Sequence, residues 1–216
     1  MSLDAVFFDF DGLILDTETP EVIAWQHLYA DHGLEFPDEI WQRMIGEAGT
    51  EIGRLPLTHL ERMLGRPINH AELEEANRIK RHAMIEQQPV MPGVQELLQE
   101  LRARFVPLAV VSSSRHPWVF GHLSRLGLVD YFQALICRSE SLPTKPAPDL
   151  YLAAKRQFGP QAVAIEDSPK GIAAAKAAGL RCFAVPNSLT KQLDLSGADR
   201  VFNSVGEITY EELSRW

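Results

Sequence analysis

Two pairs of carboxylates each follow directly on a short apolar segment of the chain. Asp9 and Asp11 end the first such segment, and Glu166 and Asp167 follow another one far along the sequence. Short apolar segments that run into turn residues are typical of buried strands. Carboxylates gathered in one place raise each other's pKa unless a cation lies among them. Oxygen ligands without nitrogen or sulfur suit Mg²⁺, which works beside phosphate groups in enzymes. The sequence therefore predicts a Mg²⁺ site that serves phosphate chemistry.

Hydroxyl, ammonium and backbone N–H groups are expected near these carboxylates. Ser112 and Ser113 end another apolar segment. Lys145 lies in a loop before a helical segment, and Gly12 follows directly on Asp11. In an open parallel sheet, ligands bind beyond the carboxyl ends of the strands, so these groups would meet at one edge. Singly, each is as typical of a turn or a helix cap, but together they predict a phosphate-binding site.

Strand-like and helix-like segments alternate over most of the chain. Strands are expected at 3–10, 107–111, 134–137, 162–165, 181–185 and 200–202. Helices are expected between them at 94–104, 118–126, 149–158 and 170–178. Strands that alternate with helices of about 10 residues imply βαβ units and a parallel sheet. The predicted fold class is α/β, with a Rossmann-like, doubly wound parallel sheet.

The stretch 17–88 has a different pattern and predicts an all-helical insert after the first strand. Apolar residues recur there at helical spacing, Met63 and Ile79 among them, and prolines separate the helical segments. We therefore expect an α/β core from 1–16 and 89–216, with 17–88 as a cap. Residues 17–87 hold 13 Asp and Glu against 7 Lys and Arg, so most of the net charge of −8 lies in the insert. This balance argues against a basic clamp.

Length and composition exclude several classes of protein. The chain has 216 residues, 45% of them hydrophobic and 23% charged, which is typical of a globular protein. No apolar stretch approaches the roughly 18 residues that span a bilayer, and the acidic balance argues against a nucleic-acid partner. The first apolar segment contains carboxylates, unlike a secretion signal, and both cysteines lie in apolar segments. A cytoplasmic protein with no membrane partner is expected.

The polar motifs together resemble the haloacid dehalogenase-like hydrolase superfamily, in particular the subgroup with a helical cap after the first strand. The resemblance rests on the order and spacing of four motifs: Asp9-Phe10-Asp11-Gly12, Ser112, Lys145 in Lys-Pro-x-Pro-Asp, and Glu166-Asp167-Ser168. It implies an aspartyl-phosphate mechanism. Asp9 would attack phosphorus, and Asp11 would protonate the leaving oxygen and later deprotonate water.

The resemblance also implies roles for the other residues of the motifs. Ser112 and Lys145 would hold the phosphoryl oxygens, with Ser113 beside them and Gly12 offering its backbone N–H. The ligands of Mg²⁺ would be Asp9, Asp167 and the backbone carbonyl of Asp11, with Glu166 close to the metal.

A Mg²⁺-dependent phosphatase that acts on a small phosphorylated metabolite, such as a sugar phosphate, is the leading functional hypothesis. The alternative is a phosphomutase of the β-phosphoglucomutase type. The cap of that enzyme carries a His shortly after the first motif and an Arg in a later loop. Here Glu21 stands in place of the His, and 46–49 contains no Arg. Glu21 is anionic and is therefore a poor group for attracting a phosphorylated sugar.

Other members of the superfamily fit less well. Dehalogenases and phosphonate-cleaving enzymes lack the second Asp of the first motif, so Asp11 favours phosphate ester chemistry. A non-catalytic binding protein on the same fold is disfavoured, because every polar group of the core motifs is present.

Overall fold

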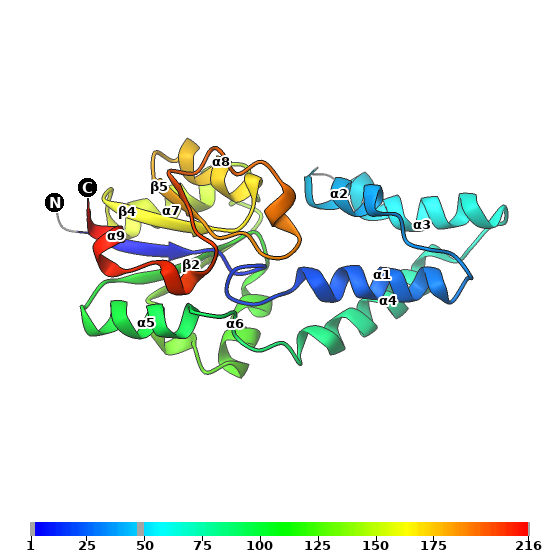
Figure 1. Cartoon of the computed structure of the whole chain (residues 1–216), viewed down its shortest axis with the longest axis horizontal. Helices are drawn as coiled ribbons and strands as arrows, with labels where there is room; N and C mark the ends of the chain where they lie inside the picture. Colours follow the sequence, from blue (N-terminus) through cyan, green and yellow to red (C-terminus); the bar gives the residue numbers. More distant parts are fainter. Residues whose placement is uncertain (1–2, 47–49, 216) are drawn as a thin grey trace. The chain divides into compact units, whose positions relative to one another are not determined.

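A computed structural model describes residues 3–46 and 50–215 (Figure 1). The chain divides into two compact units. One comprises Met1–Asp16 with Pro89–Trp216, and the other comprises Thr17–Gln88. In the first unit, helices α5 and α6 cover one face of a sheet, and α7 and α8 cover the other (Figure 1).

The sheet of the larger unit has six parallel strands in the order β3-β2-β1-β4-β5-β6. The strands are β1 (Ala5–Phe8), β2 (Leu108–Ser112), β3 (Ala134–Cys137), β4 (Ala162–Glu166), β5 (Arg181–Ala184) and β6 (Arg200–Val201). The chain runs outward from β1 to β3, then crosses to the other side of β1 to form β4. This reversal beside β1 is the position where doubly wound sheets bind ligands. The predicted α/β class is confirmed.

The strands and helices predicted for the larger unit are present, and their ends differ from the predicted ones by at most two residues. The helices of this unit are α5 (Val94–Ala103), α6 (His116–Arg125), α7 (Asp149–Phe158), α8 (Pro169–Ala177) and α9 (Tyr210–Ser214). The first strand was expected over 3–10 but spans only Ala5–Phe8. Asp4 instead accepts a hydrogen bond from the backbone N–H of Gln161 through its side chain, at 2.8 Å. At the other end, the Phe10 carbonyl accepts from the backbone N–H groups of residues 14 and 15, which closes a turn.

In the smaller unit, every regular element of the described residues is a helix. The helices are α1 (Glu18–Ala30), α2 (Asp38–Gly46), α3 (Thr50–Leu64) and α4 (His70–Ile85). Helix α1 packs on α4, and α2 on α3. Trp25 and Tyr29 of α1 are fully buried and fill the interior of this unit. No helix of the described residues is long and apolar enough to cross a membrane.

Two apolar residues of the insert do not lie on the buried faces where helical spacing predicts them. Met63 is 53% exposed and Ile79 is 56% exposed. Helical residues advance by about 100° each, so Ile79 lies roughly opposite Asn77, which is 1% exposed. The buried face of α4 therefore passes through an amide rather than through Ile79.

Candidate active site

The predicted carboxylates meet where β1 and β4 end. Phe8 pairs with Ile165 in the last register position of these strands, so Asp9 and Glu166 follow at the same level. Asp167 comes one residue later. One oxygen from each of the three carboxylates lies within 4.8 Å of the other two, and all three residues are buried. The parallel register thus brings together side chains that are far apart in the sequence.

Lys145 supplies the positive charge of this cluster. Its Nζ lies 2.5 Å from Asp9 Oδ1 and 2.6 Å from Glu166 Oε1. Its backbone N–H donates to Ser113 Oγ at 3.1 Å, so the Ser113 hydroxyl holds the Lys145 main chain. Tyr151, on α7, donates its hydroxyl proton to the same Glu166 oxygen that Lys145 contacts. The ammonium group is therefore fixed between two carboxylates.

The charges of the cluster explain its pKa shifts. Burial alone would lower the pKa of Lys145, but Asp9 and Glu166 outweigh it and hold that pKa above its usual value. Burial raises the pKa of Asp9 to about 8; Lys145 opposes this rise, while Glu166 and Asp11 add to it. The carboxylates share one ammonium, so Asp9 lacks enough positive charge nearby to stay ionised. A divalent cation would correct this deficit.

The donor set fits a divalent metal ion. Glu166 Oε2 is fully buried and has no hydrogen-bond partner among the described residues. A buried carboxylate oxygen without a partner is costly unless a cation or water satisfies it. All the candidate ligands are oxygen atoms, which is the preference of Mg²⁺.

Asn187 holds the carboxylate of Asp167 in place. Its Nδ2 donates to Asp167 Oδ2 at 2.9 Å and to the Gly12 carbonyl at 3.4 Å. Gly12 has φ +85°, and a Cβ atom there would overlap the Asp167 carboxylate. Glycine is therefore required at residue 12, both for its left-handed backbone and for its close approach to Asp167.

Asp11 is held apart from the three-carboxylate cluster. Its Oδ2 accepts from Ser114 Oγ at 2.7 Å and from Ser112 Oγ at 3.3 Å. Its Oδ1 accepts from Trp118 Nε1 at 3.0 Å. The two aspartates of the first motif thus have different surroundings: Asp9 lies beside an ammonium, whereas Asp11 lies among hydroxyl and indole donors. This difference is what two carboxylates need in order to perform opposite tasks.

Sequence reasoning assigned no role to four residues of the site: Ser114, Trp118, Tyr151 and Asn187. Asn187 lies three residues beyond β5 at the same sheet edge, so the strand-end rule that found Asp9 could have found it too. Ser114 follows directly on Ser112 and Ser113, the two serines predicted to bind phosphate. Tyr151 and Trp118 lie inside helices and carry no local signal, because only tertiary packing brings them to the carboxylates.

Two predictions concern the insert, one for 46–49 and one for Glu21. Gly46 is the last residue of α2, and the rest of the expected cap loop, 47–49, lies outside the described residues. Glu21 forms an ion pair with Arg81, at 2.9 Å between Oε1 and Nη1. Arg81 thus partly offsets the charge of Glu21, and the expectation that Glu21 is a poor group for attracting a phosphorylated sugar stays a prediction.

A family model for haloacid dehalogenase-like hydrolases matches residues 6–185. The chain belongs to this family. It is 36% identical over 209 residues to a Bacillus subtilis (strain 168) protein named "Putative phosphatase YhcW", with 95% of this chain and 94% of that protein covered. It is 30% identical over 228 residues to the β-phosphoglucomutase of the same organism, with 98% and 94% covered.

A solved structure of a family member has the same fold. CbbY from Rhodobacter sphaeroides, determined in complex with xylulose-(1,5)bisphosphate, is 26% identical to this chain. The two align with a TM-score of 0.74 over 99% of this chain and 100% of CbbY. The expected resemblance is thereby confirmed, and the protein is an enzyme of the hydrolase class.

Proposed function

We propose that this protein is a Mg²⁺-dependent phosphatase that hydrolyses a small phosphorylated metabolite through an aspartyl-phosphate intermediate. The observation that carries the proposal is the buried Asp9–Lys145–Glu166 network at the ends of β1 and β4, with Asp167 beside it. A nucleophilic carboxylate needs positive charge nearby before it can approach an anionic phosphoryl group. This network provides one fixed cation and the ligands for a second.

In the first half of the reaction, Asp9 attacks the phosphorus atom. A bond forms between Asp9 oxygen and phosphorus, and the bond from phosphorus to the substrate oxygen breaks. Asp11 gives its proton to that leaving oxygen. Lys145 donates a hydrogen bond to one phosphoryl oxygen, and Ser112 turns its hydroxyl proton from Asp11 to another, which stabilises charge in the transition state.

In the second half, water attacks the phosphorus of the aspartyl phosphate. Asp11, now ionised, takes a proton from the water, and Asp9 leaves as a carboxylate. Inorganic phosphate is released and both aspartates return to their starting states. Ser114 and Trp118 keep the Asp11 carboxylate in one place through both proton transfers.

The residues that would hold Mg²⁺ are Asp9, Asp167 and the backbone carbonyl of Asp11, with Glu166 adjoining. When bound, Mg²⁺ supplies the positive charge that keeps Asp9 ionised and offsets the charge of the phosphoryl group. Asn187 positions Asp167 for this role through its hydrogen bond to the carboxylate, and Gly12 leaves the space that this carboxylate occupies.

Sugar phosphates are the substrate class that the relatives favour. A Thermotoga maritima relative, 28% identical over 191 residues, is named as a phosphorylated carbohydrates phosphatase. The CbbY structure contains a sugar bisphosphate.

We also place the enzyme in the cytoplasm, because Cys137 and Cys182 are buried and free, as in reducing compartments.

A phosphomutase is the second candidate, and the 30% identity to β-phosphoglucomutase is the observation that favours it. The absence of a His at Glu21 and of an Arg in 46–49 favours the phosphatase. Glucose 1-phosphate with a bisphosphate primer separates the two. Faster release of inorganic phosphate than of glucose 6-phosphate supports the phosphatase, and the reverse supports the mutase.

Hydrolysis of p-nitrophenyl phosphate tests the chemistry itself. We expect turnover with Mg²⁺ and its loss after exhaustive chelation, with recovery when Mg²⁺ is restored. Undiminished turnover after chelation would contradict a metal-dependent mechanism.

A further inference from the structure

The helical unit contains a cavity of its own, between α2 and α3. Its volume is about 490 Å³, within the range of about 300–1,000 Å³ that is typical of small-molecule sites. Ile40 gives it an apolar wall, and all of the lining residues belong to 17–88. None of its lining residues therefore belongs to the carboxylate cluster of the core unit.

Cationic side chains line this cavity although the insert is strongly acidic. Arg43 of α2 and Arg62 of α3 both contribute to the lining, and Glu39 is its one carboxylate. Arg62 has no carboxylate partner among the described residues. On α4, by contrast, Arg78 and Arg81 are both paired with glutamates. A positively charged cavity in an otherwise acidic unit favours the binding of anions.

His59 gives the cavity a further hydrogen-bonding group. The hydroxyl of Tyr29 donates its only proton to the Pro56 carbonyl at 2.7 Å, so it can only accept from His59 Nδ1, 3.1 Å away. Nδ1 therefore carries the proton of the neutral ring. Nε2 is left with no partner among the described residues, although His59 lines the cavity. Burial and the neighbouring Arg62 lower the pKa of His59, and an anion would offset both effects.

We propose that the cavity binds a small polyanion that carries phosphate or carboxylate groups and bridges Arg43 and Arg62. Guanidinium groups match both kinds of anion with paired hydrogen bonds. His59 becomes a donor at Nε2 once protonated, whereas the Thr58 hydroxyl already donates to the Arg54 carbonyl at 3.1 Å. Because the bound anion contacts both α2 and α3, it ties the two helices together. This site does not depend on the proposed phosphatase activity.

An NMR titration of the full chain tests the proposal. Inorganic phosphate and citrate are added separately, without Mg²⁺ and at constant ionic strength. We expect saturable shifts of the Thr58 and His59 signals, with a dissociation constant below about 10 mM, and a rise in the pKa of His59. The tighter of the two probes identifies the class of anion.

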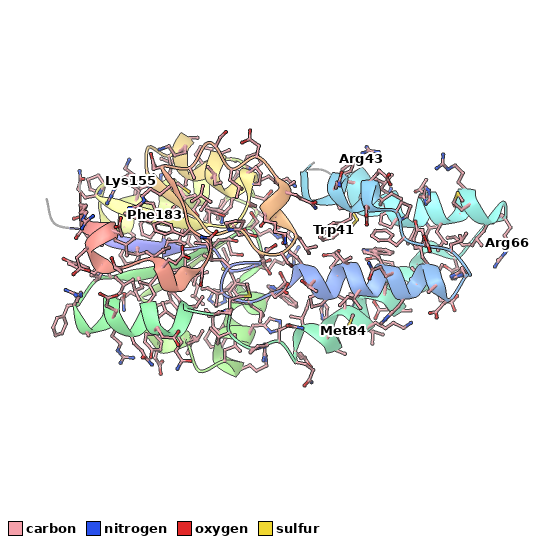
Figure 2. The ribbon with its side chains drawn as sticks, viewed as in Figure 1. Trp41, Arg43, Arg66, Met84, Lys155 and Phe183 are labelled. Carbon is pink, nitrogen blue, oxygen red and sulfur yellow. The ribbon has the colours of Figure 1, made fainter. Side chains whose placement is uncertain are left out.

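Arg62→Gln and Arg66→Gln form a matched pair of variants. Arg43 and Arg62 line the cavity, but Arg66, just beyond α3, does not. Figure 2 shows Arg43 on α2 and Arg66 at the end of α3. We expect R62Q to weaken binding at least about tenfold, the loss typical of a charge-assisted hydrogen-bonded pair, and R66Q to leave it within about twofold.

Three results would overturn the proposal. One is the absence of saturation at the cavity, and another is an equal loss in both variants, which would indicate diffuse attraction to surface charge. The third is a set of shifts confined to Gly12 and Ser114, which would place the anion at the core site alone. Circular dichroism and thermal unfolding confirm that both variants fold.

Discussion

Carboxylates serve opposite purposes in the two units of this protein. At the strand ends of the core, Asp9, Glu166 and Asp167 are buried and share the single ammonium of Lys145. The insert carries more net negative charge, but pairs such as Lys80 with Asp31 lie there on the surface. Net charge therefore does not locate the site. What distinguishes the core carboxylates is burial together with too few counter-charges.

The largest expected effect is that of removing the nucleophile. Asp9→Asn should reduce hydrolysis of p-nitrophenyl phosphate by at least about 10³-fold, because an amide cannot form the aspartyl phosphate. Glu75→Gln, an exposed change on α4, serves as the control and should leave turnover unchanged. Circular dichroism checks that both variants fold. Substantial activity in the Asp9 variant would remove it from the nucleophile role.

The next effect concerns Asn187, which hydrogen-bonds to the proposed metal ligand Asp167. Asn187→Ala should raise the Mg²⁺ concentration for half-maximal activity by about 10–100-fold, the usual cost of losing a residue that orients a ligand. The rate at saturating Mg²⁺ should fall much less. Asn77→Ala removes a buried amide from the insert and should leave the Mg²⁺ requirement unchanged. A parallel change in both variants would indicate a general loss of stability instead.

A comparison of two glycines with left-handed backbones separates the effect of backbone strain from that of a steric overlap with a neighbouring side chain. Gly12 has φ +85° and Gly33 has φ +72°, but only Gly12 has neighbouring atoms where a Cβ would lie. Alanine at Gly33 should cost about 1 kcal/mol in the free energy of unfolding, and alanine at Gly12 should cost more because its Cβ also overlaps Asp167. Only Gly12→Ala should also reduce activity, by at least about tenfold, because it displaces Asp167. Denaturant unfolding and Mg²⁺-dependent kinetics measure the two effects, and equal activity in both variants would refute the contact argument.

The smallest effect belongs to the surface of the insert. Lys80→Ala breaks the exposed pair with Asp31 and should change the free energy of unfolding by at most about 0.5 kcal/mol. High salt should mask even this difference, since exposed charges are screened. Urea unfolding at low and high salt is the measurement. A loss of several kcal/mol would show that this pair is not the weak surface interaction that its exposure indicates.

The α/β class and the sheet edge of the site follow from local patterns in the sequence. Apolar runs that end in Asp9, Ser112 and Glu166 predict strands, and the carboxyl ends of parallel strands must share an edge. Helical periodicity likewise predicts the helices of 17–88. These features depend on spacing along a short stretch of chain, which a sequence displays directly. The catalytic roles of the residues remain predictions.

Strand order and side-chain partners were decided by tertiary structure alone. The reversal beside β1 places Asp9 next to Glu166, and packing brings Tyr151 and Asn187 to the carboxylates. The same is true of the insert, where Asn77 is buried. The periodicity of apolar residues predicts that a segment is helical. It does not predict which of its residues will be buried by contacts with distant segments. Those contacts join segments that are distant in sequence, so no local pattern encodes them.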